Sequence, residues 1–354
     1  MKKTLIAMAV LGAASGFAMA ASNVTLYGVI ETGVVVEKAK HEDTTVAMKS
    51  GFDQGSRWGI KGTEELGNGY SVGFILEQGF SSDNGNEGAD KKQFNRESIL
   101  NVKGGFGSLA FGRTGTLSSG AQSQQILTGW ALGTGFGISA WNANSLGATT
   151  YGATWRADNA VSYATPTFGG FSLHAMYSNG FAGDEAKWSK NNHYYGLGVK
   201  YQEGAIKSSL ILEALDGKNE AAHNELYAIN FGLEYNLGSV TPMFAYRFMD
   251  QDNGLKLHKF GLSAKINVAG GDALVGASYL FGKDDAVTTG DDDVRSWNIG
   301  AAYIYPLSKR TAVKAYAGYA DSGKAWKDKN LDPKGAVTAV YNGYQVFFGL
   351  RHQF

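Results

Sequence analysis

The feature that most constrains this chain is an alternation of apolar and polar residues that recurs along nearly its whole length. Residues 69–80, 205–214 and 340–353 are typical segments. In the last of them, apolar side chains occupy every second position: Tyr344, Val346, Phe348 and Leu350. A period of two places these side chains on one face of a β-strand. No segment carries the longer apolar period of an amphipathic helix, so the sequence predicts an almost entirely β-structured chain.

The connections between the predicted strands alternate in length. About sixteen strands are expected, separated by eight long connections at 38–53, 81–93, 115–155, 179–192, 215–223, 250–256, 282–293 and 321–339. The seven short connections are 66–68, 104–107, 166–169, 203–204, 237–238, 269–271 and 306–310. An even number of strands, tight turns at one end and long loops at the other is typical of an antiparallel transmembrane β-barrel. The alternative, a soluble β-sandwich, would mix connection lengths and use Greek-key crossovers.

Composition agrees with a barrel. Glycine makes up 49 of 354 residues, about twice its ordinary share, and glycine suits tight turns and curved strands. The mean hydropathy is −0.20, because only the lipid-facing half of each strand needs to be apolar. A closed sheet pairs all backbone groups internally, as a bilayer requires. A barrel of sixteen strands is too wide for side chains to fill, so its interior should hold water.

The first twenty residues have the pattern of a secretory signal peptide. Lys2 and Lys3 precede an apolar stretch at residues 5–14, and Ala18-Met19-Ala20 forms a small-x-small cleavage site. The apolar stretch is too short to span a bilayer as a helix. The sequence therefore predicts a signal peptide at 1–20 and a single barrel domain at 21–354, exported from the cytoplasm of a Gram-negative bacterium.

Several functional classes are disfavoured by composition and motifs. The chain has no cysteine, so a disulfide scaffold or thiolate metal site is excluded. Lysine plus arginine equals aspartate plus glutamate at 32 each, which argues against nucleic acid as a partner. No metal-binding histidine pair or cofactor motif is present, and no catalytic set stands out that would indicate an enzyme. Acidic clusters at 83–90, 284–285 and 291–293 are interpreted as solvated loop charge, bridged by divalent cations to lipopolysaccharide.

Six segments resemble the general trimeric porins of Gram-negative outer membranes, most closely the beta-proteobacterial and neisserial type. They are VTLYGVI at 24–30, SRWGIKGTEELGNG at 56–69, NRESILNVKGGFGSLAFGR at 95–113, RADNAVSYATPTFGG at 156–170, YPLSKRT at 305–311 and GLRHQF at 349–354. They span the chain from the first to the last predicted strand. The resemblance implies a homotrimer of water-filled pores that passes small hydrophilic solutes and ions. It also implies that the third long loop, 115–155, folds into the lumen and narrows it.

The same resemblance assigns roles to individual residues. Arg57, Arg113 and Arg156 match the basic wall that faces the constriction loop in such porins. The terminal Phe354 resembles the sorting signal recognised by the membrane-insertion machinery, and it also suits an aromatic girdle at the interface. In the family, acidic residues on the third loop commonly oppose the basic wall. In this chain the acidic residues of the third loop are missing, because residues 114–155 form a run of 42 without a single charged side chain.

A ring of arginines in a narrow aqueous throat favours anions over cations. Lys61 and Arg96 would strengthen this preference, whereas Glu77 and Asp158 would weaken it on reaching the lumen, as would Glu31 and Glu97. Two further interpretations stay open. In the first, the arginines pair with wall carboxylates and hold the loop in place, and they do not select ions. In the second, the channel selects one class of solute, such as carboxylates or phosphate. A mainly structural or adhesive barrel is the third alternative.

Overall fold

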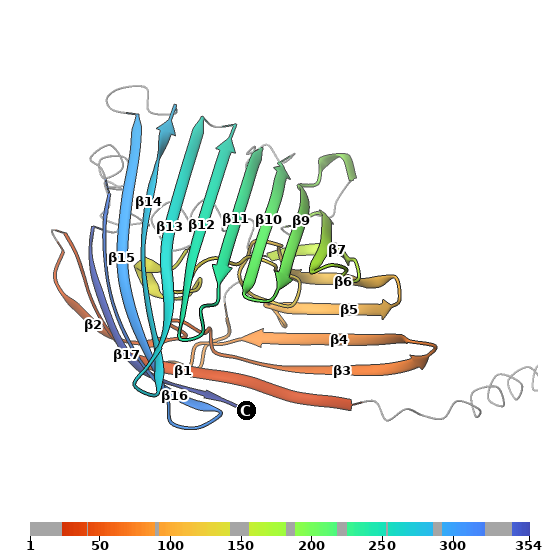
Figure 1. The fold of residues 1–354 in the computed structure, drawn as a ribbon, viewed down its shortest axis with the longest axis horizontal. Coiled ribbons are helices and arrows are strands. Elements are labelled where there is room, and N and C mark those ends of the chain that lie inside the picture. The colour runs from red at the N-terminus through yellow and green to blue at the C-terminus, as the bar shows by residue number, and fades with distance from the viewer. Residues whose placement is uncertain are drawn as a thin grey trace, which may run out of the picture.

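The structure, a computed structural model, describes residues 23–40, 42–88, 92–141, 156–181, 188–217, 225–252, 254–285, 292–322 and 342–354. Its strands form one antiparallel sheet that closes into a barrel with sixteen strand positions, as predicted (Figure 1). In the ranges just given, the connections include the short 3₁₀ segments Gly137–Ser139 and Trp188–Lys190. In the described part of the chain, no helix is long and apolar enough to cross a membrane. The predicted signal peptide at 1–20 lies outside the described residues.

The strands follow one another around the barrel in chain order. They are β1 (Asn23–Ala39), β2 (Thr45–Ser50), β3 (Arg57–Gly67), β4 (Tyr70–Gly79), β5 (Glu97–Gly104), β6 (Gly107–Gly115), β7 (Arg156–Ala164), β8 (Phe171–Asn179), β9 (His193–Glu203), β10 (Ile206–Asp216), β11 (Leu226–Tyr235), β12 (Val240–Gln251), β13 (Leu255–Val268), β14 (Gly271–Asp284), β15 (Asp293–Pro306), β16 (Thr311–Ser322) and β17 (Gly343–Gln353). Each pairs antiparallel with its neighbours.

The first and last strands close the barrel. One edge of β1 pairs with β17, from Val29↔Gln353 to Ala39↔Gly343. Its other edge pairs with β3, so β1 has a partner on both sides. The backbones of Gly28 and Phe354 exchange two hydrogen bonds of 3.1 Å, which extend the ladder to the last residue. A sheet closed in this way pairs its two edge strands with each other, the arrangement that a bilayer tolerates.

One predicted long connection contains a strand that sequence reasoning missed. Within 38–53, residues 45–50 form β2, which pairs with the same edge of β1 as β3 does. The two strands together fill one barrel position and are separated by residues 51–56. These six residues lie opposite only two residues of β1, Ile30 and Glu31. Polar and aromatic contacts made by Phe52 and Asp53 replace the strand pairing that the segment gives up.

The predicted connection at 250–256 is shorter than expected. Strands β12 and β13 continue to Gln251 and from Leu255, and their pairing runs as far as Gln251↔Leu255. Only residues 252–254 remain between them. The polar residues in this stretch hid the strand ends, because a side chain near the end of a barrel strand need not be apolar to form the ladder.

Burial in this barrel is the reverse of that in a water-soluble protein. Along β13, β14 and β15 the exposed and buried positions alternate strictly over most of each strand. The exposed set is apolar: the side chain of Leu262 is 68% exposed and that of Phe348 is 64% exposed. The buried set includes Asn230, Asn298 and Lys314. The apolar face therefore points outward and the polar face inward.

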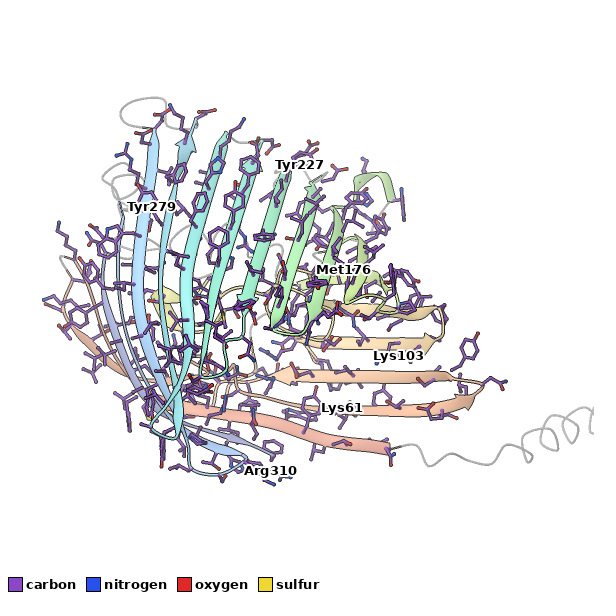
Figure 2. All side chains as sticks on the ribbon, viewed as in Figure 1. Lys61, Lys103, Met176, Tyr227, Tyr279 and Arg310 are labelled. Carbon is purple, nitrogen blue, oxygen red and sulfur yellow. The ribbon has the colours of Figure 1, made fainter. Side chains whose placement is uncertain are left out.

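Aromatic side chains gather on the outer face near the end that carries the long connections. Tyr227 and Tyr279, both exposed, are labelled on β11 and β14 in the upper part of Figure 2. Trp297 packs against Tyr319 with 5.5 Å between ring centroids. At the opposite end, Arg310 lies in the turn between β15 and β16 (Figure 2). Such a girdle is typical where a barrel crosses the interface between lipid and water.

The third connection reaches far around the barrel. Its described part, residues 115–141, begins at the last residue of β6. Leu117 already donates its backbone N–H to the hydroxyl of Tyr194 on β9 (3.4 Å). Ala131 donates to Ser263 on β13 (2.9 Å) and Ser139 to the hydroxyl of Tyr316 on β16 (3.1 Å). These partners belong to the inward-facing set. Residues 142–155 of the predicted loop lie outside the described residues.

A pair of glycines allows the closest of these approaches. A Cβ atom on Gly232 of β11 would lie 2.0 Å from the carbonyl oxygen of Thr128. Gly129 has φ +92°, and a Cβ there would lie 2.3 Å from the carbonyl oxygen of Phe244. Only residues without a side chain permit this contact of connection and wall.

Candidate functional site

Glu77 on β4 is shared by two arginines of the inner wall. Arg57, the first residue of β3, places its Nε 3.3 Å from one carboxylate oxygen. Arg96, directly preceding β5, donates its Nε–H to the other oxygen at 2.7 Å. The hydroxyl of Tyr27 also donates to Glu77, at 3.1 Å. Two guanidinium groups thus surround one carboxylate, which leaves one formal positive charge in excess.

Asp158 on β7 forms a second cluster of the same composition. Arg113 of β6 donates to one of its oxygens and Lys92 to the other. Arg113 also donates its Nε–H to the carbonyl oxygen of Asn95 at 2.8 Å. Again two cations meet one carboxylate. Glu77 and Asp158 thus both contact cations of the wall, and their effect on ion selectivity stays a prediction.

The basic wall borders a cavity of about 520 Å³. Its lining includes Arg57, Arg96, Arg156 and Glu77 on the wall. Opposite them lie residues 120–122 and 134–135 of the third connection and residues 51–55. The side-chain oxygen of Gln122 accepts a hydrogen bond from Arg156 at 3.1 Å once the amide is oriented to satisfy both of its ends. Three of the predicted basic residues therefore meet at one cavity that faces the uncharged segment.

The remaining predicted residues lie elsewhere. Lys61 is exposed on β3, four residues from Arg57 toward the short turn, and its Nζ lies 5.1 Å from the ring centroid of Tyr27. Arg113 belongs to the cluster around Asp158 and does not line the cavity. Phe354 ends the chain beside Gly28. Its role as an insertion signal stays a prediction.

Sequence reasoning missed a buried ion cluster between β1, β16 and residues 51–56. The Nζ of Lys314 lies 2.6 Å from Glu31 and also contacts Asp53. The side chains of Lys314 and Glu31 are 0% exposed. The second oxygen of Glu31 accepts the backbone N–H groups of Asp53 (2.6 Å) and Gln54 (3.0 Å). Lys314 is a single lysine among small residues at an inward position, the one signal that pointed to a buried partner.

Glu97 and two acidic residues of the predicted loop clusters also have partners, while Asp90 and Asp291 of those clusters lie outside the described residues. One oxygen of Glu97 accepts hydrogen bonds from the hydroxyls of Thr114 and Ser123. Of the acidic loop clusters, Asp292 pairs with Lys283 at 3.2 Å and Asp293 with Arg295 at 2.8 Å. Among the residues that the structure describes, no group of three or more His, Asp or Glu is arranged to hold a metal ion.

Residues 7–325 match the family described as Gram-negative porin. The chain belongs to the Gram-negative porin family. This porin therefore lies in the outer membrane, as predicted, with its barrel spanning the bilayer. In such barrels the short turns face the periplasm and the long loops face outward.

Relatives extend over the whole chain. Outer membrane porin protein 32 of Delftia acidovorans is 32% identical over 368 residues, and an outer membrane porin protein of Bordetella pertussis is 30% identical over 410 residues. Each alignment covers 100% of both proteins. Among solved structures, the anion-selective porin from Comamonas acidovorans superposes with a TM-score of 0.73 at 27% identity, covering 94% of this chain and 100% of that one.

Proposed function

We propose that this porin forms a water-filled channel through which small hydrophilic solutes and ions diffuse passively, with a moderate preference for anions. We also propose that the third connection, predicted as 115–155, folds into the lumen and narrows it. The contacts of residues 117, 131 and 139 with inward side chains of β9, β13 and β16 support this path. No step of the proposed function is catalytic, and none requires a cofactor.

The observation that carries the anion preference is the sharing of one wall carboxylate, Glu77, by two arginines. Glu77 lies between Arg57 and Arg96, and Asp158 lies between Arg113 and Lys92. The Glu77 cluster retains one positive charge. In a narrow throat with low-dielectric walls, such an excess lowers the energy of an anion and raises that of a cation.

Two carboxylates act against this preference and make it moderate. Asp53 and Glu97 line the same cavity as the arginines. Lys314 contacts Asp53, and one oxygen of Glu97 is occupied by hydrogen bonds from the third connection. Arg156 donates to the side-chain oxygen of Gln122 at 3.1 Å. The cavity lining thus carries three arginines and three carboxylates, and the preference rests on the sharing of Glu77 by Arg57 and Arg96. The related porin described as anion-selective is consistent with this preference.

The test is the reversal potential of purified protein in planar lipid bilayers under a potassium chloride gradient. We expect stepwise conductance and a reversal potential of the sign given by a channel that passes chloride faster than potassium. A potential of the opposite sign would overturn the anion preference. Conductance that saturates with one solute would instead favour a substrate-selective channel, and the absence of steps would favour a structural barrel.

We infer that the working form is a homotrimer in contact with lipopolysaccharide. The general trimeric porins that the chain resembles support the trimer, and the exposed apolar side chains of β1 and β3, such as Leu26 and Trp58, offer a surface for association. The mass of the protein in mild detergent should correspond to three chains. A monomer or dimer under those conditions, with conductance retained, would contradict the inference.

A further inference from the structure

The uncharged stretch raises the question of how the third connection is held in place. Residues 114–155 contain no Asp, Glu, Lys or Arg, so they cannot form ion pairs with the wall. The described part nevertheless contacts strands spread over more than half of the barrel. The wall must therefore provide the strong partners.

Glu97 and Glu234 provide two of these partners as acceptors. Glu97 on β5 accepts the hydroxyl of Ser123 at 2.5 Å and its backbone N–H at 3.2 Å. Glu234 on β11 accepts the hydroxyl of Thr128 and the backbone N–H of Gly129 at 3.1 Å. Hydrogen bonds to an ionised group are about twice as strong as those between neutral groups. Each carboxylate thus holds a different turn of the connection.

Lys259 on β13 provides a third partner as a donor. Its Nζ donates to the carbonyl oxygen of Trp141 and lies 4.6 Å from the centroid of the same indole ring. The guanidinium carbon of Arg247 on β12 lies 6.0 Å from that ring. Lys259 is 4% exposed and Arg247 is 3% exposed. Cation–π contacts of this kind strengthen when both groups leave water.

We propose that Glu97, Glu234 and Lys259 are positioning residues, here named anchor residues, that hold the uncharged third connection against the wall. The proposal rests on the proposed function in taking this connection as the element that narrows the channel. Lys259 with Arg247 then serves to place Trp141 and does not belong to the ion path. The charged groups therefore belong to the wall. They form hydrogen bonds with neutral donors and acceptors of the connection and a cation–π contact with an indole ring.

If these residues act as anchors, substituting them should change channel width without changing ion selectivity. If they acted as a charge filter, ion selectivity would change as well. Lys259 is 4% exposed, and the side chain of Glu234 is 19% exposed, so removing either charge should change the ion path less than removing an arginine of the basic wall. It should instead let the connection move away from the wall. Channel width and closing events would change, while the ratio of anion to cation permeability would stay close to that of the wild type.

The experiment compares Lys259→Met and Glu234→Gln with Lys265→Met as the matched control. Lys265 lies on the same strand as Lys259 and loses the same charge, and its ion-pair partner at 4.0 Å is Asp272 of the wall, which is not an anchor residue. Liposome swelling with neutral sugars of increasing size reports channel width. Planar bilayers report closing events and the reversal potential. Glu234→Gln keeps the shape of the side chain, so it remains informative if Lys259→Met folds poorly.

We expect both anchor variants to raise the fraction of channels with a displaced connection about tenfold or more. Losing a hydrogen bond to a charged group changes an equilibrium constant by about that factor. Swelling by larger sugars and the frequency of closing should rise in both variants. The reversal potential should stay near that of the wild type, and the Lys265→Met control should match the wild type in all three measurements. A shift of the reversal potential toward cations without a change in swelling would overturn the proposal, as would no change at all. A cation-selective wild type would refute the anion preference of the proposed function and would leave the anchor proposal standing. The swelling comparison would still test the anchors.

Discussion

A chain carrying Lys314→Met should lose about 3–5 kcal/mol of unfolding free energy, the typical cost of removing one partner from a buried ion pair. Lys314 contacts both Glu31 and Asp53, and the first of these side chains is 0% exposed. Methionine keeps the length of the side chain but removes the ammonium group. Two carboxylates would then face each other in a buried site without the ammonium group that contacts both, which is strongly unfavourable.

Equilibrium unfolding in urea, followed by tryptophan fluorescence of protein folded into lipid or detergent, measures this loss. Lys309→Met is the control, since that lysine lies in an exposed turn and should change the free energy by less than about 0.5 kcal/mol. Adding Glu31→Gln and Asp53→Asn to Lys314→Met should recover part of the loss, because no unpaired charge then remains. A loss below about 1 kcal/mol in the single variant would show that the two carboxylates do not depend on Lys314.

The double variant Arg57→Gln and Arg96→Gln should lower the ratio of chloride to potassium permeability about tenfold, on the basis that about 1.4 kcal/mol corresponds to a factor of ten. Both arginines contact Glu77, so their removal turns a local excess of one positive charge into one negative charge. A unit charge about 4 Å away contributes roughly 1–4 kcal/mol between bulk water and a protein surface. The reversal potential should therefore shift toward that of a channel that passes potassium faster than chloride.

Lys103→Gln with Lys309→Gln is the matched control for this variant. It removes the same two charges from exposed positions at the short-turn end, outside the cavity lining. Salt screens such distant charges, since the Debye length is about 10 Å at 0.1 M. If the control shifts the reversal potential as much as the arginine variant does, the preference comes from the overall charge of the pore. If neither shifts it, the arginines lie outside the ion path.

Local residue order was sufficient to predict much of the fold. The period of two assigns each side chain to the inner or outer face of its strand, because successive side chains point to opposite sides. The glycine-rich short turns, such as 67–69 with positive φ at all three residues, mark one end of the barrel. Parity alone also places Glu77 on the inner face of β4. β2 was missed because its six residues are cut off from β3 by 51–56.

Which charges meet was decided by the tertiary structure. Parity assigns a face, but the partner of a charge depends on strand register and on closure of the barrel. Lys314 and Glu31 are 283 residues apart and meet because β1 and β16 both pair with β17. Arg57, Glu77 and Arg96 meet because the registers of β3, β4 and β5 bring them to one height.

The sequence by itself therefore determined the strands, the faces of the barrel, its location and the long stretch without charge. It could not determine that this stretch depends on charges supplied by distant strands, because a carboxylate or an ammonium group has no local signal for the neutral group it will bind. Only the closed barrel places Glu234 beside Thr128 and Lys259 beside Trp141. The physical reason is that hydrogen bonds act over about 3 Å, a distance set by three-dimensional packing and not by separation along the chain.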